Sequence, residues 1–358
     1  MSRLIRAVID TSALRHNLKT IRERAPESRV MAVVKANAYG HGLVPTALAL
    51  ADADAFAVAR LEEGLALRAA GVTRPIVLLE GVFASEQLLE AARHGFDIVV
   101  HEQLQIELLE KFSGAHRFVL WVKIDTGMNR LGFRPADFSA ALEKLRKLQP
   151  APLELRVLTH LARADEPDSS MTEEQVKRFE ALTGKLDYEN SIANSAGIFR
   201  TSPARCDWVR PGLALYGVSP FPDRIGTDFG LHPVMALEST VIATRLVARG
   251  ETVGYGGVWK AARDSTIAIV AAGYGDGLPR GLPNGTPVLI GGRRAPLVGR
   301  VSMDMIAVDV TDLPPVKMGT AVTLWGGDLP VEEISRHAGT IPYELLCSVS
   351  QRVPLELR

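Results

Sequence analysis

The stretch PIVLLEGVFASEQLLEAARHGFDIVVHEQLQIELLEKF, Pro75 to Phe112, contains the pattern that decides the fold. Two short apolar runs, residues 75–81 and 97–101, indicate buried strands, and each is followed by an amphipathic run of helical period, at 85–95 and 102–112. Strands that alternate with helices in this way form βαβ units, in which the strands lie parallel and the helices cross over. The stretch therefore predicts an α/β domain.

The same alternation extends to both sides, from Asp10 to about Pro220. Further helical patterns lie at residues 61–71 and 172–182. Eight parallel strands with crossover helices suit a closed (β/α)8 TIM-type barrel better than an open sheet, and we assign residues 1–225 to this barrel. The eight expected strands are residues 29–34, 55–60, 75–81, 97–101, 117–125, 153–160, 190–194 and 208–217.

Beyond about Phe221 short strands cut by Gly and Pro replace the helices. This pattern predicts an all-β domain, which we assign to residues 226–358, with residues 219–233 as the linker. One short helix is expected within it, at residues 331–339. The strand-rich segments are residues 234–259, 265–277, 286–310 and 320–327.

The composition excludes several classes of protein. A chain of 358 residues with 47% hydrophobic and 23% charged residues has room for two globular domains. Its 41 basic and 41 acidic side chains leave no net charge, so we expect no nucleic-acid or membrane partner. The two cysteines, Cys206 and Cys347, form no CxxC pair, which favours a reducing cytoplasm and no metal. The N-terminus has no apolar core or cleavage site, so we expect a cytoplasmic, unprocessed protein.

Five polar residues fall at or just after the ends of the expected barrel strands. They are Lys35, Arg130, His160, Ser195 and Arg210. In (β/α)8 enzymes the loops at this end of the strands carry the chemistry. Each residue alone has a structural explanation, as a solvated cation or a hydrogen-bonded histidine. Together on one rim, they favour a functional site.

Lys35 is the most informative of them because it ends an apolar run. A lysine among apolar neighbours favours its neutral amine, which can act as a nucleophile in Schiff-base chemistry. The sequence contains no GxxxxGK[ST], HExxH or GxSxG motif. Its GYGGVW and GYGDGL strings, at 254–259 and 273–278, lack a strand-turn-helix context and indicate turns of the β domain instead.

Nine strings along the chain, in order, resemble those of the alanine racemases. The resemblance covers nearly the whole chain and implies a barrel followed by a β domain, pyridoxal 5'-phosphate as cofactor, and racemisation of alanine. The strings are AVVKANAYGHG (32–42), KIDTGMNRLGF (123–133), THLARADE (159–166), ANSAG (193–197), VRPGLALYG (209–217), VGYGGVW (253–259), AGYGDGLPR (272–280), GRVSMDM (299–305) and TIPYELLCSVSQRVP (340–354).

Racemisation needs two acid/base groups on opposite faces of the α-carbon. By resemblance, Lys35 carries the cofactor and serves the face of D-alanine, while Tyr255 serves that of L-alanine. A tyrosine is ionised to only about one part in a thousand at neutral pH, so cationic neighbours must support it. The resemblance assigns this support to His160 and Arg210. It also sets Arg210 against the pyridine nitrogen, where a guanidinium keeps its own proton and leaves the ring nitrogen without one.

The remaining site residues are also implied by the resemblance. Arg130 would contact the phenolic oxygen of the cofactor and the substrate carboxylate, and Lys123 would hold Arg130 as a carbamate, although a plain lysine on a strand is the alternative. The backbone N–H of Met303 would also contact the carboxylate, with Tyr274 and Asp304 at the entrance. The expected phosphate contacts are Tyr39, Ser195, Tyr343 and the backbone N–H groups of Gly212 and Leu213.

Four of these residues, Tyr255, Tyr274, Met303 and Asp304, lie in the β domain. The resemblance implies that they reach the barrel of a partner subunit, in a homodimer with shared active sites. Ser302 stands where many family members have Cys, and Ser191 where some have a His that supports His160. Two alternatives stay open: a racemase of serine or a basic amino acid, and a non-catalytic cofactor-binding protein. A role in peptidoglycan synthesis or in alanine catabolism is also open.

Overall fold

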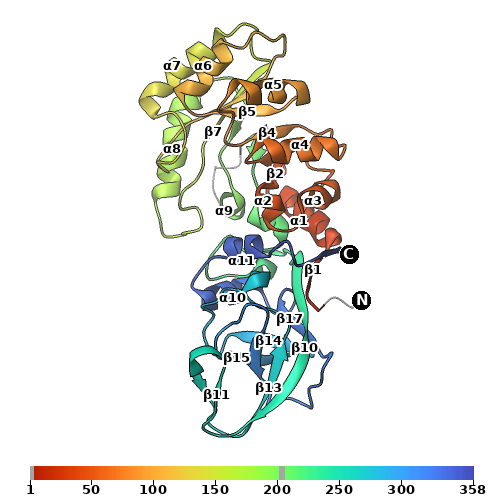
Figure 1. Ribbon diagram of the computed structural model, residues 1–358. Coiled ribbons are helices and arrows are strands. Elements are labelled where there is room, and N and C mark those ends of the chain that lie inside the picture. The colour runs from red at the N-terminus through yellow and green to blue at the C-terminus, as the bar shows by residue number, and fades with distance from the viewer. Residues whose placement is uncertain (1–3, 201–205) are drawn as a thin grey trace. The chain divides into compact units, whose positions relative to one another are not determined.

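The computed structural model describes residues 4–200 and 206–358 (Figure 1). Its contacts divide the chain into two compact units, called here the barrel unit and the sheet unit, which are built differently. The barrel unit runs from Arg15 to Ala38 and from Gly42 to Leu215. The sheet unit contains the described residues up to Leu14, Tyr39–His41 and Tyr216–Arg358.

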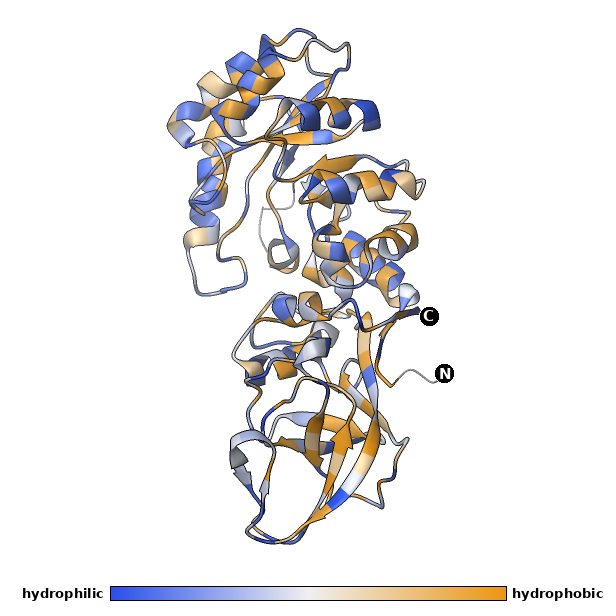
Figure 2. Ribbon diagram, viewed as in Figure 1, coloured by the Kyte–Doolittle hydropathy of each residue, from blue (hydrophilic) through white to orange (hydrophobic). Residues whose placement is uncertain are grey.

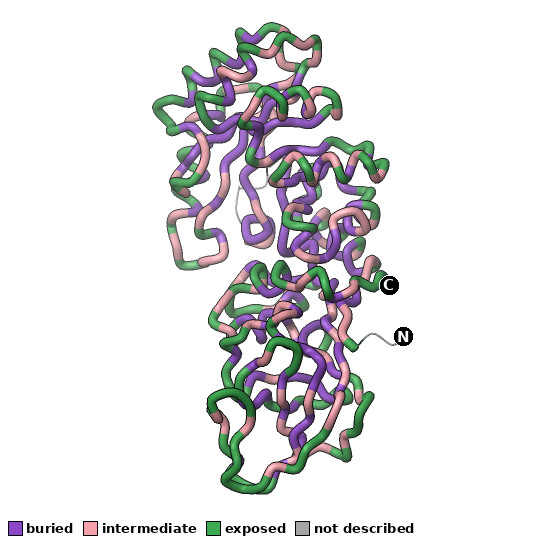
Figure 3. Tube along the Cα trace, in the orientation of Figure 1, coloured by how far each residue is buried: buried purple, intermediate pink, exposed green. Residues whose placement is uncertain are grey.

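Eight parallel strands close into a barrel in the first unit, as the alternating pattern predicts. Each strand pairs with the next along the chain, and β2 pairs with β9 through Val30 and Val209 to close the ring. The strands are largely apolar and buried (Figures 2 and 3), because helices cover the outside and side chains fill the interior. They are β2 (Arg29–Val33), β3 (Ala55–Val58), β4 (Ile76–Leu78), β5 (Asp97–Val100), β6 (Val119–Lys123), β7 (Glu154–Leu158), β8 (Asn190–Ser191) and β9 (Trp208–Val209).

Helices follow the strands on the outside of the barrel. In α5 (Ser85–His94) Leu88 and Ala91 are buried while Glu86 is exposed, which is the amphipathic arrangement that the sequence predicts. The four helices expected in this half are present as α4 (Leu61–Ala69), α5, α6 (Gln103–Glu110) and α8 (Met171–Thr183). The structure adds α1 (Thr11–Arg24), α3 (Leu43–Ala49), α7 (Pro135–Arg146) and α9 (Ser195–Phe199).

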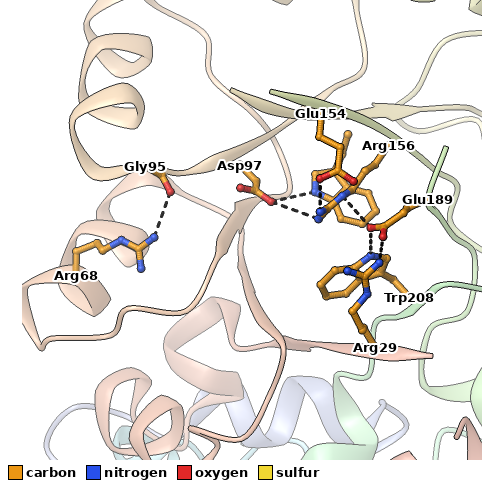
Figure 4. Close-up of polar contacts among 9 residues, drawn as sticks. Arg29, Arg68, Gly95, Asp97, Glu154, Arg156, Glu189 and Trp208 are labelled. Atoms are coloured by element: carbon orange, nitrogen blue, oxygen red, sulfur yellow. Dashed lines mark hydrogen bonds and ion pairs between the residues drawn. The ribbon is translucent and has the colours of Figure 1, made fainter. Parts of the chain in front are cut away.

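A network of charged and aromatic side chains fills the end of the barrel where the strands begin (Figure 4). Arg156, at the start of β7, forms ion pairs with Glu154 at 2.5 Å, with Glu189 at 3.0 Å and with Asp97 at 3.9 Å. Burial raises the pKa of Asp97 to about 6, although Arg156 opposes this shift.

Two tryptophans complete this network. The guanidinium of Arg156 lies 5.1 Å from the ring centre of Trp121 and 5.2 Å from that of Trp208. Trp208 donates from its indole N–H to Glu189 at 2.8 Å, and Arg29 lies over the same ring at 4.4 Å. Cation–π contacts and charged hydrogen bonds of this kind offset the cost of burying the charges. In (β/α)8 enzymes the active site lies at the opposite end, where the strands end.

The second unit is built on an eight-stranded sheet in the order β13-β16-β15-β14-β17-β10-β1-β18. The long strand β10 alternates buried and half-buried residues over its first part, as a sheet with one covered face requires, and it also pairs with β13. The strands are β1 (Arg6–Ile9), β10 (Met235–Val247), β13 (Ser265–Val270), β14 (Pro287–Ile290), β15 (Arg293–Val298), β16 (Ile306–Asp309), β17 (Ala321–Trp325) and β18 (Leu355–Leu357).

Short elements complete the sheet unit. Strands β11 (Thr252–Val253) and β12 (Trp259–Lys260) form a separate antiparallel pair. The expected helix at 331–339 is present as α10 (Val331–Ala338). Three single 3-10 turns lie in this unit, η2 (Gly226–Phe229), η3 (Tyr255–Gly257) and η4 (Tyr274–Asp276), while η1 (Leu213–Tyr216) lies where the chain passes from the barrel unit to the sheet unit.

Two features of the sheet unit were not anticipated. The expectation of a single helix was wrong, because α11 (Pro342–Ser348) follows α10; its proline occupies the first turn, where a missing N–H costs nothing. In addition, β1 pairs antiparallel with β10 and parallel with β18, so the first strand of the chain belongs to the C-terminal sheet. The boundary at residue 225 stays a prediction.

Among the described residues, no helix has both the length and the apolar character that a membrane crossing requires. Residues 1–3, on which the expectation about the N-terminus partly rests, lie outside the described residues.

Candidate active site

Lys35 follows the buried strand β2 and is the first residue of the turn labelled α2 (Lys35–Tyr39) in Figure 1. Residues Ala36 to Tyr39 all have φ between 52° and 54°, which is a left-handed helical turn made of L-residues. This conformation costs about 1–2 kcal/mol per residue and persists only where the surroundings fix it. The left-handed turn directly after Lys35 therefore lowers the local stability of the chain.

Hydrogen bonds fix this turn at both ends. The N–H of Ala38 donates to the carbonyl of Val34 at 2.8 Å. Asn37 accepts twice: its carbonyl from the N–H of Gly42 at 3.0 Å, and its side-chain oxygen from the N–H of Leu43 at 2.8 Å. At the far end of the turn Gly40 has φ 82°, and a Cβ there would lie 2.1 Å from the carbonyl oxygen of Leu346. The turn is thus held by backbone contacts that leave Lys35 at the strand end.

Lys123 lies at the end of β6 and is 9% exposed. Its pKa is lowered to about 8, mainly by burial and then by the positive charges of Arg210, Arg130 and Lys35. Three of the predicted strand-end residues therefore lie near enough to Lys123 to repel its charge. A cluster of four basic side chains attracts an anion.

Arg210, directly after β9, is 4% exposed and deeply hydrogen-bonded. Its guanidinium donates to the hydroxyl of Ser191 at 2.5 Å, and to the carbonyls of Thr159 at 2.5 Å and Ile192 at 3.2 Å. Burial lowers its pKa to about 10, so the side chain keeps its charge at neutral pH. These bonds orient a permanent cation at the rim.

His160 lies at the end of β7, among the same cations. Burial lowers its pKa well below the usual value, and the charges of Arg210 and Lys123 lower it further. The imidazole is therefore neutral at neutral pH, with one nitrogen that donates and one that accepts. It can take part in a hydrogen-bonded chain without adding a charge.

Ser195 begins α9 and is buried. Its hydroxyl oxygen accepts from the N–H of Gly212 at 3.0 Å and from the N–H of Ala214 at 3.2 Å. Leu213, between them, begins η1. Because the oxygen accepts both of these bonds, the hydroxyl hydrogen of Ser195 can be donated to another group, as a phosphate ligand requires.

Tyr39 and Tyr343 lie together in the sheet unit. Their ring centres are 5.7 Å apart, and the ring of Tyr39 lies 4.8 Å from that of Tyr216. Burial raises the pKa of Tyr39, so this phenol stays protonated and can donate. The sequence did not single out Tyr216, although it belongs to the quoted VRPGLALYG string.

The remaining predicted residues lie in the turns of the sheet unit. Tyr255 begins η3 and is 69% exposed. The N–H of Tyr274 donates to the carbonyl of Ser302 at 3.0 Å, and the carbonyl of Met303 accepts from the N–H of Gly275 at 2.9 Å. The two turns that carry Tyr274 and Met303 are therefore joined through the backbone.

Arg352 fixes the same region. It forms ion pairs with Asp304 at 2.9 Å and with Asp276 at 2.8 Å, and it donates to the carbonyl of Met303 at 3.3 Å. Asp304, predicted at the entrance, is thus held by a charge partner that the sequence did not identify. Tyr255 and Tyr274 remain exposed on this chain.

Three polar residues around Arg210 and His160 were missed or given another role. Ser191 was noted only as a departure from a histidine that supports His160 in some family members, and its hydroxyl accepts from Arg210. Thr159 and Gln175 were not singled out, although Thr159 directly precedes His160. No motif marks Gln175, because its contacts depend on how α8 packs on the barrel.

The residues present fit pyridoxal 5'-phosphate. The cofactor is an anion with a phosphate and an aldehyde, and the barrel unit offers a cluster of cations, a lysine amine, and converging donors at Ser195 and Gly212. The cations of that cluster lower the pKa values of Lys123 and His160, and a bound anion would relieve this repulsion.

Comparisons with known families and proteins all match one family. A family model described as "Alanine racemase, N-terminal domain" matches residues 9–220, and one described as "Alanine racemase, C-terminal domain" matches residues 234–357. The alanine racemase of Aeromonas hydrophila is 49% identical over 350 residues, and that of Nitrosococcus oceani is 50% identical over 350 residues. These matches cover 98% and 97% of this chain, and 98% of each relative.

Solved structures of the same kind have the same fold. The biosynthetic alanine racemase from Pseudomonas aeruginosa superposes with a TM-score of 0.97 at 45% identity. The alanine racemase from Acinetobacter baumannii gives 0.94 at 41% identity. Both matches cover 100% of each chain.

Proposed function

This chain belongs to the alanine racemase family and interconverts L- and D-alanine, and we propose that it does so with pyridoxal 5'-phosphate bound covalently to Lys35. It is an isomerase of class EC 5.1.1.1. The observation that carries the cofactor proposal is the cluster of four cations, Lys35, Lys123, Arg130 and Arg210, at the ends of the barrel strands.

The phosphate of the cofactor would be held by the hydroxyl of Ser195 and the backbone N–H groups of Gly212 and Leu213. By resemblance, the phenols of Tyr39 and Tyr343 would also contact it. Two backbone N–H groups donate to the oxygen of Ser195 and so orient its hydroxyl hydrogen away from them, which supports the role of Ser195 as a donor.

Arg210 would face the pyridine nitrogen. Its guanidinium stays charged at neutral pH and is held by three acceptors, so it can donate a hydrogen bond to the ring but does not release its proton. When bound, the cofactor supplies an electron sink that makes the α-proton of alanine removable. A ring nitrogen that stays unprotonated makes this sink weaker and disfavours side reactions at the cofactor carbon.

Two acid/base groups would then move the proton. The amine of Lys35 would take it from, or return it to, the face of D-alanine, and the phenol of Tyr255 would do the same on the face of L-alanine. The phenolate needs support from a cation, which neutral His160 can relay from Arg210 through hydrogen bonds.

The substrate carboxylate would bind Arg130 and the backbone N–H of Met303. Lys123 would support Arg130 as a carbamate, which converts one cation of the cluster into an anion. Its lowered pKa favours the neutral amine that carbamate formation requires. Tyr274 and Asp304 would line the entrance, where aromatic side chains leave room for a small substrate.

We propose that the protein works as a cytoplasmic homodimer with shared active sites. Tyr255, Tyr274 and Met303 are exposed on this chain, which suits residues that complete the site of a partner. Two-fold dimers are the commonest closed assembly, so the proposal needs no unusual symmetry.

Incubation of the purified protein with L-alanine in heavy water tests the function. Loss of optical activity together with deuterium at the α-carbon supports racemisation through proton exchange. Parallel assays with serine, lysine and arginine test the substrate, and faster turnover of any of these would contradict the assignment to alanine. A protein that binds the cofactor without exchange would instead be a carrier.

A further inference from the structure

Gln175, on α8, is fully buried and uses each of its polar groups. Its amide nitrogen donates to the carbonyl of His160 at 3.0 Å and to the hydroxyl of Thr126 at 3.2 Å. Its amide oxygen accepts from the N–H of Ala162 at 2.9 Å. A glutamine amide has two N–H donors and one carbonyl acceptor, so all three functions are engaged. Two of the three bonds hold the backbone directly after His160, at its own carbonyl and at the N–H of Ala162.

The bond to Thr126 continues into a chain of hydroxyl groups. The hydroxyls of Thr126 and Thr159 are 2.8 Å apart, and that of Thr159 donates to the carbonyl of Ile124 at 2.8 Å. Because each hydroxyl has a single hydrogen, Thr126 must then donate to Thr159 and accept from Gln175. The direction of every bond in the chain is fixed.

The last hydroxyl of this chain belongs to Thr159, whose backbone carbonyl contacts Arg210. The carbonyl of Thr159, the residue that receives the bond from Thr126, accepts from the guanidinium of Arg210 at 2.5 Å. Thr126 also lies on the loop that leads from β6 to Arg130, four residues later. The side chain of Gln175 therefore joins the segment that carries His160 to the segment that carries Arg130. Through Thr126 and Thr159 it also reaches the carbonyl that accepts from Arg210.

We propose that Gln175 is a positioning residue of the racemase, which holds the backbone at His160 and, through Thr126 and Thr159, the carbonyl that orients Arg210. The inference rests on the proposed function of these two residues. Gln175 itself would touch neither substrate nor cofactor. Displacements of about 1 Å in a catalytic group can cost on the order of 100-fold in rate, so a buried amide behind the site can have a kinetic effect.

The barrel contains a matched control. Gln105, on α6, is also fully buried, accepts from the N–H of His101 at 2.8 Å and donates to the carbonyl of Glu80 at 3.1 Å. It joins two neighbouring strand-end loops in the same way, but those loops carry none of the proposed site residues. Removing either amide leaves buried backbone groups without partners, so both changes should lower stability alike.

The test compares Gln175→Met with Gln105→Met, in which the two buried amides are replaced by side chains of similar size. We expect Gln175→Met to lower kcat by about 10-fold or more with little change in KM, because a contact that matters in the transition state is disturbed. Its pH–rate profile should also shift, and hydrogen exchange at the amide of Ala162 should accelerate. Gln105→Met should keep kcat within about 3-fold of the wild type, as a purely structural change does.

A double-mutant cycle tests the chain itself. Thr126→Val should lower kcat in the same direction, and the double variant Gln175→Met with Thr126→Val should lose less than the product of the two single effects, since both changes break one chain. If Gln175→Met does not fold, Thr126→Val, which removes one hydroxyl, carries the test.

An unchanged kcat and pH profile in folded variants, or equal losses in Gln175→Met and Gln105→Met, would overturn the inference. A wild-type protein without racemase activity would instead contradict the proposed function.

Discussion

The guanidinium of Arg210 donates to the hydroxyl of Ser191 at 2.5 Å, from one barrel strand to its neighbour. The same hydroxyl donates to the carbonyl of Trp208 at 2.8 Å, so its hydrogen and one lone pair are both used. A serine at this position therefore fixes Arg210 by direct contact. By resemblance, some family members have a histidine at this position. In this protein the hydroxyl of Ser191 accepts from Arg210 and donates to the carbonyl of Trp208.

Arg210→Lys should lower the rate of racemisation by about 100-fold or more, because a single ammonium cannot replace a fork held by three acceptors. The measurement is kcat with L-alanine. Arg68→Lys is the control, since Arg68 donates to four backbone carbonyls from α4, outside the barrel. Equal activity in the two variants would contradict the role of Arg210.

Lys123 should react with carbon dioxide. With a pKa of about 8 roughly one tenth of the amine is neutral at pH 7, against about one part in three thousand for an ordinary lysine. The neutral nitrogen can attack carbon dioxide and release a proton, which leaves a carbamate among the cations. We expect a carbamate carbon signal in NMR spectra of the wild type in carbon-13-labelled bicarbonate and none at this site in Lys123→Arg. A spectrum common to both proteins would show that Lys123 remains a plain lysine.

Asp97 should make the barrel less stable as the pH rises. Its pKa is raised to about 6 in the folded state from 3.8, so the folded state binds the proton more tightly. The stabilisation that protonated Asp97 contributes to the folded state is therefore complete below about pH 4 and is lost as the pH rises through 6. Relative to Asp97→Asn, the free energy of unfolding of the wild type should fall by about 2 kcal/mol between pH 4.5 and 7.5. Denaturant unfolding at several pH values measures this, and parallel curves for the two proteins would contradict it.

Shared active sites predict that two inactive proteins restore activity when combined. Lys35→Ala and Tyr255→Phe each remove one of the two proton-transfer groups from every site of their own homodimers. In a mixed dimer, one site contains Lys35 of one subunit and Tyr255 of the other. Coexpression or refolding of the two variants together should therefore recover up to about one quarter of the wild-type activity, as random pairing allows. Each variant refolded alone is the control, and a mixture as inactive as its parts would show that the two residues come from the same chain.

Much of the barrel could be predicted because its signal is local. Each strand is a short apolar run and each helix an amphipathic one, so both appear within a few residues of sequence. The strand-end position of Lys35, Arg130, His160 and Arg210 followed directly from this alternation. Eight strands of this kind suit a closed ring better than an open sheet.

The features that were missed depend on contacts between distant residues. The strand β1 is only four residues long, and its partners β10 and β18 lie more than 200 residues away in the sequence. Similarly, Gln175 is an ordinary residue of an amphipathic helix until α8 packs against the loop after β7. The left-handed turn after Lys35 could not be predicted from the sequence either. Ala and Tyr do not favour positive φ, and Asn favours it only at single positions.

That turn has a consequence for when the protein becomes reactive. Four consecutive L-residues wound in the mirror-image sense cannot hold this shape in an unfolded chain, where the ordinary right-handed and extended conformations are cheaper. The backbone after Lys35 therefore takes this shape only once the surrounding chain has assembled. A nascent or partly unfolded polypeptide would contain the same amine but would not hold it at the end of a strand.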